Sequence, residues 1–367
     1  MSVVNTICRL WTLLLLLLSG EGRLQCRDDG NRPVDWLVAY KLPLMKESSN
    51  PIIRKGLGYV YITSDSIDSG WTLSAKSANG SDSFLGHSLK PLYETTINND
   101  LLWLLYNDET PNKTVTFDLG HTKGIVLSEV DGGIWLVHSV PRYPPIPGTP
   151  QSAYSYPHSG TYFGQSFLCI SLAMDQLDLV GLQLLYNEPQ VYSSNIPSSF
   201  KQSASHLAAV TQHTRISTAP WYHQLQLSTI GGIPFVTFAK TKKFGKDLYA
   251  DWVAPSLKTN MLVETWPNGK GRLPSECQQP YKVKNIEGVK LEVANVSFKT
   301  HVDHSKWGVS SENTSSWVCV GDINRMQSQE ARSGGTVCIN NPKLWIQYRN
   351  TVTQIEPCSK LQVSKYY

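Results

Sequence analysis

Short apolar runs rich in β-branched and aromatic residues recur along the chain, and glycine, proline, asparagine or serine separates them. Runs of this length and composition are typical of β-strands, and the intervening turn residues end an ordered element. The pattern predicts strands over residues 36–40, 59–62, 124–127, 134–138, 293–298, 318–320 and 336–339. Much of the chain is therefore expected to form β-sheets.

Three other segments carry apolar residues at a helical spacing, over residues 99–106, 174–186 and 343–349. Strands and helices together predict an α/β or α+β fold. With 367 residues, of which 41% are hydrophobic and 17% charged, the chain can fill two cores or one large double-layered domain.

Two segments interrupt the predicted elements. Residues 141–148 contain four prolines, which remove amide donors and fix the backbone, so a rigid exposed loop is expected. The polar stretch 192–205 is the best candidate for a boundary. We therefore expect an N-terminal half over residues 23–200 and a C-terminal half over residues 201–367.

The N-terminus has the pattern of a secretory signal peptide. Arg9 precedes an apolar block that ends in six consecutive leucines, Leu13–Leu18, and small and polar residues follow. This block is too short to span a bilayer, and no later run reaches about 18 apolar residues. We predict that residues 1–22 are a cleaved signal and that the mature protein has no membrane anchor.

Cysteine usage agrees with a secretory route. Removing Cys8 with the signal leaves six cysteines, which are Cys26, Cys169, Cys277, Cys319, Cys338 and Cys358. An even number in an oxidising compartment predicts three disulfides, although six cysteines allow 15 pairings. Four sequons, at Asn79, Asn112, Asn295 and Asn313, mark candidate glycosylated surface loops.

The most chemically informative motif is a histidine and a lysine two residues apart, found at His121/Lys123 and again at His304/Lys306. In an extended strand this spacing puts both side chains on the same face. The lysine supplies a fixed charge for phosphate oxygens, and the histidine can act as nucleophile or proton donor. A single pair is common by chance and typical of a solvated strand edge, but two pairs in opposite halves indicate a phosphodiester site.

A second polar cluster follows each motif. His138 lies 17 residues after His121, and Gly321–Asn324 lies 17 to 20 residues after His304. This parallel indicates a weak internal duplication.

Charge and aromatic residues add weaker indications. The formal net charge of +4 permits a polyanionic partner, and the basic segment Lys240–Lys246 is either a phosphate-contacting loop or a solvated turn. His301 and His304 lack a matching third ligand, so we expect no metal. Trp135 and Trp307 adjoin the motifs and are candidate walls of a groove.

Six stretches carry a resemblance to a known family: Asp35–Trp36 with Tyr40–Pro43, His121–Gly124, Asp131–Pro141, Ser159–Ser166, Asp303–Trp307 and Cys319–Arg325. Together they resemble deoxyribonuclease II, over essentially the whole mature chain. The resemblance implies the pseudo-twofold fold of the phospholipase D superfamily, in which two similar halves each have a central mixed sheet flanked by helices. It also implies disulfides that join Cys26 to Cys169, Cys277 to Cys358, and Cys319 to Cys338.

The function implied by the resemblance is an acid endonuclease that needs no metal or other cofactor and leaves 3′-phosphate ends. Its partner would be double-stranded DNA, read with little sequence specificity. The resemblance implies a lysosomal enzyme delivered by the secretory pathway, or a secreted one, as a monomer or homodimer.

The chain departs from the superfamily signature in one respect. That signature has an aspartate five residues after the lysine, where this sequence has Ser128 and Ser311. The carboxylate that orients each histidine is therefore missing from its usual place. We expect Asp322 and Asn324 to support one half and His138 the other.

The two motifs together predict a two-step reaction. One neutral histidine attacks phosphorus to form a phosphohistidine, and the other, protonated, donates to the departing oxygen and then activates water. Lys123 and Lys306 would hold the phosphate oxygens. The sequence does not decide which histidine attacks, and we favour His121.

Two other functions fit parts of this pattern. A phosphodiesterase of the same fold could act on lipid head groups. A non-catalytic secreted binder of nucleic acid or glycan could have the fold without the chemistry, but the presence of both His-x-Lys pairs argues against it.

Overall fold

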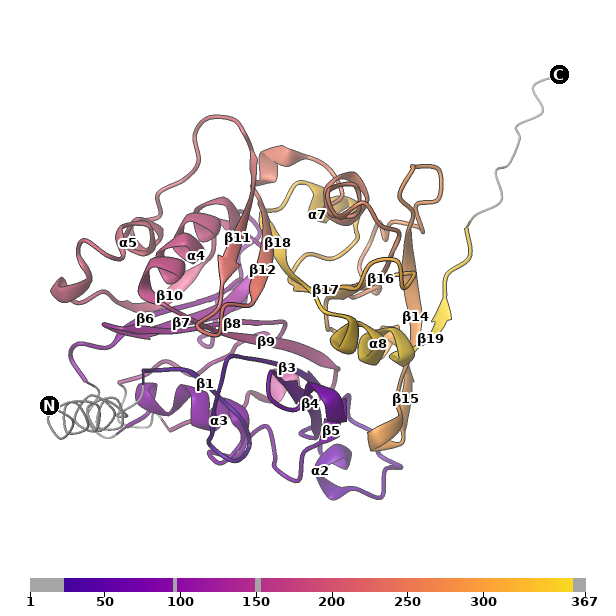
Figure 1. Cartoon of the computed structure of the whole chain (residues 1–367), viewed down its shortest axis with the longest axis horizontal. Coiled ribbons are helices and arrows are strands. Elements are labelled where there is room, and N and C mark those ends of the chain that lie inside the picture. Colours follow the sequence, from indigo (N-terminus) through magenta and orange to yellow (C-terminus); the bar gives the residue numbers. More distant parts are fainter. Residues whose placement is uncertain (1–22, 95–97, 149–152, 359–367) are drawn as a thin grey trace, which may run out of the picture.

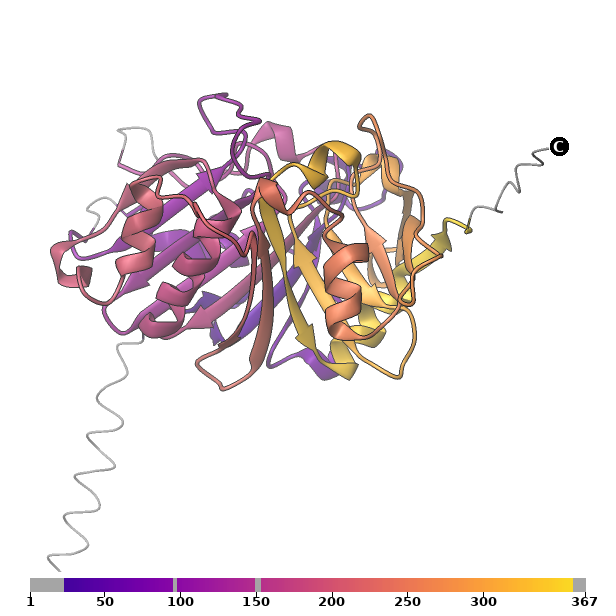
Figure 2. The same ribbon diagram turned by 90° about the horizontal axis from the view of Figure 1, so that it is seen from above.

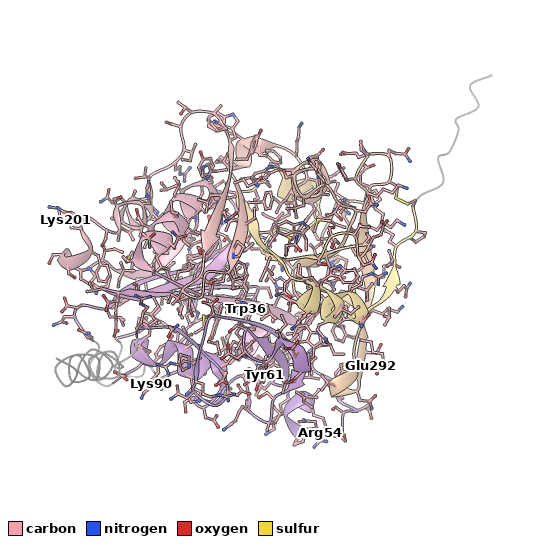
Figure 3. All side chains as sticks on the ribbon, viewed as in Figure 1. Trp36, Arg54, Tyr61, Lys90, Lys201 and Glu292 are labelled. Atoms are coloured by element: carbon pink, nitrogen blue, oxygen red, sulfur yellow. A yellow bond between two sulfur atoms is a disulfide. The ribbon has the colours of Figure 1, made fainter. Side chains whose placement is uncertain are left out.

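The computed structural model describes residues 23–94, 98–148 and 153–358, so the predicted signal at residues 1–22 lies outside the described part. The described chain has an α+β fold dominated by two large sheets. The two sheets lie next to each other in Figures 1 and 2. Side chains of both sheets contribute to one hydrophobic core. In Figure 3 the buried Trp36 lies in the interior, whereas Lys90, Lys201 and Glu292 point outward.

The first sheet has eight strands in the order β10-β6-β7-β8-β9-β3-β4-β5. In chain order they are β3 (Trp36–Lys41), β4 (Tyr59–Thr63), β5 (Thr72–Leu73), β6 (Leu102–Asn107), β7 (Lys123–Glu129), β8 (Gly132–His138), β9 (Gln165–Leu172) and β10 (Val191–Asn195). A separate two-stranded sheet pairs β1 (Cys26–Arg27) with β2 (Pro33–Val34).

The second sheet has nine strands, eight of them in the order β11-β12-β18-β17-β16-β13-β14-β15, with β19 paired to β14. Its strands are β11 (Tyr222–Ser228), β12 (Pro234–Lys240), β13 (Met261–Glu264), β14 (Val283–Leu291), β15 (Val296–Lys299), β16 (Trp307–Ser310), β17 (Trp317–Gly321), β18 (Gly334–Asn340) and β19 (Val352–Ile355). The pairing of β13 with β14 is parallel, so the sheet is mixed.

The central strands of the two sheets follow the same order. The run β6-β7-β8-β9-β3 in the first sheet corresponds to β13-β16-β17-β18-β12 in the second, and every pairing within both runs is antiparallel. A helix follows the matching strands β9 and β18, namely α4 (Met174–Asn187) and α8 (Pro342–Thr351). The weak duplication seen in the sequence thus corresponds to matching hairpins, β7-β8 and β16-β17.

Helices cover the sheets at several places. Helix α4 contacts strands of both sheets and packs on α5 (Ser205–Thr211), while α8 contacts β16, β17 and β14. The Asn341 side chain accepts hydrogen bonds from two amides in the first turn of α8 and so begins the helix. The shorter helices are α2 (Pro51–Arg54), α3 (Phe84–Leu89), α6 (Ala254–Leu257) and α7 (Gln327–Glu330).

Most predicted elements are confirmed. A strand forms in every segment where the sequence predicts one, although over 293–298 it is limited to the end of the segment, because β15 begins at Val296. The helices predicted at 174–186 and 343–349 are α4 and α8.

The helix predicted at 99–106 is wrong, because this segment forms β6. Most of its residues are buried, and they point into different hydrophobic clusters on the two faces of the sheet, Leu104 into one and Leu105 into the other. A strand covered in this way is apolar on both faces and lacks the alternation that would separate it from a helix.

Of the two irregular segments, the proline-rich loop needs correction. Residues 141–148 form a loop, but Tyr143 is fully buried and the Asn107 side chain donates to its carbonyl, so the loop packs on the first sheet. Part of the predicted boundary at 192–205 is β10, which belongs to the first sheet, and the chain reaches the second sheet only at β11.

Three disulfides join Cys26 to Cys169, Cys277 to Cys358, and Cys319 to Cys338, the pairs that the resemblance implies. The first lies within the first half of the chain and the other two within the second. In the described residues, no helix has the length and hydropathy needed to cross a bilayer. All four sequon asparagines are exposed.

Candidate active site

The two His-x-Lys motifs lie at matching positions of the two sheets. Lys123 begins β7 and Lys306 directly precedes β16, and these are corresponding central strands. The sheets meet where β17 contacts β8 and β9, and a parallel bridge pairs Gly164 with Asp303 beside the second motif. The contact between the sheets therefore brings the motifs together.

The electrostatics of the two histidines agree with this placement. Burial, followed by the charges of Lys123, Lys306 and Arg332, holds the pKa of His121 well below its usual range. Burial, followed by Lys306, Lys123 and His121, does the same to the pKa of His304. The charges of each motif therefore act on the histidine of the other, as their placement at the sheet contact leads us to expect. Both imidazoles are thus kept neutral unless an anion approaches.

His304 is held by main-chain groups of the first sheet. Its backbone N–H donates to the carbonyl of Gly164 at 2.9 Å, and its Nδ1 lies 2.9 Å from the carbonyl of Ser139. A carbonyl can only accept, so this contact, which is shorter than the 3.3 Å from the Lys306 ammonium to the same Nδ1, favours a proton on Nδ1 and leaves Nε2 as the reactive nitrogen. The indole ring of Trp266 packs against the imidazole, with the ring centroids 5.3 Å apart.

His121 has the matching environment in the second sheet. Its backbone N–H donates to the carbonyl of Ser333 at 2.9 Å. The main chain of Asp322 raises the pKa of His121, opposing the effect of burial, while Nδ1 of His121 has no hydrogen-bond partner among the described residues. Asp322 and Ser139 are equivalent, since their amides donate to Gly335 and Ser166 on the matching strands β18 and β9. Each histidine is therefore oriented by the opposite sheet.

Asp108, directly after β6, is a site residue that the sequence did not reveal. Its carboxylate accepts a hydrogen bond from the Lys123 ammonium, lies 3.3 Å from an Arg332 nitrogen, and lies 3.7 Å from Nε2 of His121. Although burial opposes ionisation, Lys123 and Arg332 together lower the pKa of Asp108. Arg332 comes from the loop before β18, so this cluster joins the two sheets.

Lys306 lies among buried acidic groups on the other side of the site. Its ammonium donates to the carbonyl of His304 at 2.7 Å. Asp303 accepts from the Tyr40 hydroxyl and from the hydroxyl of Ser305. Burial and then Asp303 raise the pKa of Glu264 well above its usual range, and neither Glu264 oxygen has a hydrogen-bond partner among the described residues. Glu264 is therefore held as the neutral acid.

The predicted supporting residues take different places. His138 is fully buried at the end of β8, where its Nδ1 accepts from the amide of Val140, and burial followed by Lys123 lowers its pKa to about 3. The Asp322 carboxylate accepts from the amide of Gly335, and burial raises its pKa to about 6. The Asn324 side-chain oxygen is buried without a partner. None of these side chains forms a hydrogen bond to His121 or His304 in the described structure.

The tryptophans predicted as groove walls and part of the basic segment lie in the interior. Trp135 and Trp307 are buried in the core and cannot wall a groove, because the strands that carry them are central in their sheets. Lys240 is also buried and binds main-chain carbonyls, so only the rest of Lys240–Lys246 is available at the surface. In residues 23–94, 98–148 and 153–358, no three metal-ligating side chains converge, and His301 has no partner ligands there.

The comparisons with known proteins concern nearly the whole chain. The family model described as deoxyribonuclease II matches residues 25–358. The chain belongs to the deoxyribonuclease II family. It is 40% identical over 352 residues to deoxyribonuclease-2-alpha of Rattus norvegicus, covering 94% of this chain and 98% of that one. It is 36% identical over 361 residues to deoxyribonuclease-2-beta of Homo sapiens, covering 97% and 98%.

Another relative is plancitoxin-1 of Acanthaster planci, which is 34% identical over 359 residues, covering 97% of this chain and 99% of that one. Both His-x-Lys motifs lie within residues 25–358, which the family model matches.

Proposed function

We propose that this protein is an acid endodeoxyribonuclease that hydrolyses DNA phosphodiesters to 3′-phosphate ends without a metal ion. The observation that carries the proposal is the placement of both His-x-Lys motifs at the contact between the sheets, where a loop of the opposite sheet accepts the backbone N–H of each histidine. Two imidazoles and two ammonium groups around one point suit a single phosphodiester. Family membership supports DNA as the substrate.

In the first step, Nε2 of neutral His121 attacks phosphorus while the bond from phosphorus to the 5′ oxygen breaks. Protonated His304 gives its Nε2 proton to that oxygen, so the leaving strand ends in a 5′-hydroxyl. In the second step, His304 takes a proton from water, and the resulting hydroxide displaces His121 from phosphorus. The product is a 3′-phosphate and the free enzyme.

The cations around the site lower the pKa of both histidines and so support a neutral imidazole as the nucleophile. Lys123, Lys306 and Arg332 all lower the pKa of His121, which favours the neutral form required of a nucleophile. The same cations can stabilise charge that develops on the phosphate oxygens. Because burial also lowers the pKa of Lys306, an acidic medium keeps this ammonium charged.

The wider architecture belongs to the same proposal. The matching strand orders support a pseudo-dimer of the phospholipase D type, with one His-x-Lys motif in residues 23–200 and the other in residues 201–367. The predicted signal, the three disulfides and the exposed sequons support a secretory route to the lysosome or to the outside of the cell.

A plasmid assay at pH 5 in the presence of a chelator tests the proposed function. We expect the supercoiled form to be converted to nicked and linear forms whose ends are 3′-phosphates. A DNA polymerase should not extend these ends until a phosphatase has removed the phosphate groups. Phosphatidylcholine vesicles serve as the competing substrate. Hydrolysis of the lipid but not of the plasmid would overturn the proposal, as would plasmid cleavage that requires added Mg²⁺.

A further inference from the structure

Two buried lysines outside the His-x-Lys motifs occupy matching places in the two sheets. Lys41 is the last residue of β3 and lies opposite Gln165, the first residue of β9. Lys240 is the last residue of β12 and lies opposite Gly334, the first residue of β18. Both lysines have no exposed surface. An ammonium group is buried at a cost unless hydrogen bonds replace its water, so the partners of these lysines indicate their role.

The partners are main-chain carbonyls of two equivalent loops. The Lys41 ammonium donates to Thr161 at 3.0 Å and to Phe163. The Lys240 ammonium donates to Glu330 at 3.0 Å and to Arg332, with a third bond to Gln329 at 3.0 Å. The two loops accept at equivalent positions. Thr161 and Phe163 lie four and two residues before the start of β9, and Glu330 and Arg332 lie four and two residues before the start of β18.

Each loop then binds a histidine of the opposite sheet. Gly164, directly after the carbonyls that Lys41 holds, accepts the backbone N–H of His304 at 2.9 Å. Ser333, directly after the carbonyls that Lys240 holds, accepts the backbone N–H of His121 at 2.9 Å. The connections therefore cross between the sheets.

We propose that Lys41 and Lys240 are positioning residues, Lys41 for His304 and Lys240 for His121, each acting through the loop that it binds. The inference rests on the proposed function, because the histidines have roles to be positioned for only if the site cleaves a phosphodiester. A lysine suits this place because one ammonium can donate to several carbonyls that point inward. Neither lysine touches the phosphate site itself, and neither forms an ion pair in the described structure.

The variants Lys41→Met and Lys240→Met remove the hydrogen bonds and keep much of the side-chain volume. The most direct measurement is the rate at which diethyl pyrocarbonate modifies His121 and His304, followed for each residue by mass spectrometry of peptides. We expect Lys41→Met to change the modification rate of His304 at least about 3-fold and to leave the modification rate of His121 unchanged within error. Lys240→Met should have the opposite selectivity.

Plasmid cleavage at pH 5 provides the second measurement. A misplacement of about 1 Å can cost on the order of 100-fold in rate, so we expect kcat to fall at least about 10-fold in each variant, with KM within about 2-fold. Leu344→Ala, which opens a cavity under α8, is the matched control for general loss of stability. Its modification rates should keep the wild-type ratio of His121 to His304.

Three results would overturn the inference. The modification rate could change equally at both histidines, it could change only at the histidine in the same half of the chain as the lysine, or it could keep the ratio seen in Leu344→Ala. If the methionine variants are not secreted, Lys41→Gln and Lys240→Gln are measured in the same way, since an amide still donates to one or two carbonyls. Failure of both pairs to fold would show a structural role and reject positioning. A wild-type protein that leaves plasmid intact would reject the proposed function, while the selective modification would still test the lysines.

Discussion

Nε2 of His121 faces a carboxylate, whereas Nδ1 of His304 faces a carbonyl. The histidines of the two motifs are therefore alike in sequence and in main-chain support, yet they differ in the charge beside the ring. A carboxylate favours the charged form of a nearby imidazole, so the two rings are not electrostatically equivalent. The residue that makes the difference, Asp108, lies 13 positions before His121 and belongs to no motif.

The first prediction concerns the histidines themselves. His121→Ala and His304→Ala should each lower kcat for plasmid cleavage at least about 100-fold, because each removes the nucleophile or the general acid. Secretion should be unaffected. His87→Ala, on α3, is the control and should keep the wild-type rate. More than a tenth of wild-type activity in either variant would reject the two-histidine mechanism.

The second prediction concerns the stability supplied by Asp108. Removing one partner of a buried ion pair costs about 3–5 kcal/mol, so Asp108→Asn should lower the free energy of unfolding by that amount. The two cations that contact the carboxylate, Lys123 and Arg332, would be left without their anion. Urea denaturation at pH 6.5 measures the loss.

Asp82→Asn is the control for this experiment, because Asp82 pairs with Lys76 at the exposed surface. Its unfolding curve should match that of the wild type. Equal curves for Asp108→Asn and Asp82→Asn would show that the buried carboxylate does not stabilise the fold.

The third prediction concerns His138, whose folded pKa is about 3 compared with an ordinary value of 6.5. The unfolded chain binds the extra proton between these values, so stability falls as pH drops from 6.5 to 3, by about 1.4 kcal/mol per unit. His138→Gln should remove this loss. Urea denaturation at pH 6.5, 5 and 4 measures the free energy of unfolding of both proteins. As the pH falls, the variant should gain stability relative to the wild type, and a difference that stays constant would contradict the prediction.

Asp322 should have the opposite pH dependence. Its folded pKa of about 6 exceeds the ordinary value of 3.8, so its contribution is present at low pH and is lost as pH rises through 6. Asp322→Asn is thus a control for the His138 experiment, because its difference in the free energy of unfolding from the wild type should change with pH in the opposite direction.

At the level of elements, the sequence predicts strands best where the apolar run is short and bounded by turn residues. β3, β4, β7 and β8 meet this condition. The strand β6 does not, because it is covered on both faces and its composition does not distinguish a strand from a helix. Asp108 directly follows β6. A helix over residues 99–106 does not predict that this carboxylate lies beside the first His-x-Lys motif.

The sequence reveals the histidines and lysines because each pair is contiguous, so a local pattern defines it. Arg332, Lys41 and Lys240 belong to no local pattern, and only the order of strands in the sheets brings them to the site. The same holds for the carbonyls of Ser139 and Asp322, since a main-chain group has no identity in a sequence. The sequence therefore predicts the reacting groups but not the groups that orient them.

The fourth prediction belongs to the disulfides that connect these elements. Cys26–Cys169 has a sequence separation of 143 and Cys319–Cys338 one of 19. The chain-entropy model gives about 5 kcal/mol for the longer loop and about 3 kcal/mol for the shorter. Urea denaturation of the double serine variants Cys26→Ser/Cys169→Ser and Cys319→Ser/Cys338→Ser should reproduce this order, and a reversed order would show that the loop length does not set the stabilisation.

At the level of the whole molecule, the site works only if one imidazole is neutral and the other charged. The active fraction is then the product of two opposed titrations, so the fifth prediction is a bell-shaped dependence of kcat/KM on pH. Both histidine pKa values lie below 6.5 in the free protein, because of burial and nearby cations, so the maximum should lie on the acid side, near pH 5 to 6.

Plasmid cleavage between pH 3.5 and 8 measures this profile, and a chelator should leave it unchanged. Lys123→Met, which removes one of the cations acting on both histidines, should move the maximum toward higher pH. A rate that rises steadily to pH 8 would contradict the paired titration.

In the described structure no disulfide joins the two sheets, and the segment 212–221 between α5 and β11 is largely exposed. A protease that cuts there would leave two fragments held together without a covalent bond, by the shared core, by polar contacts such as Arg332–Asp108, and by the carbonyls that accept from each other's histidine. Each fragment would retain a complete His-x-Lys motif without its support. Catalysis by the cut protein would then depend on concentration, persisting while the fragments remain associated and disappearing when dilution separates them.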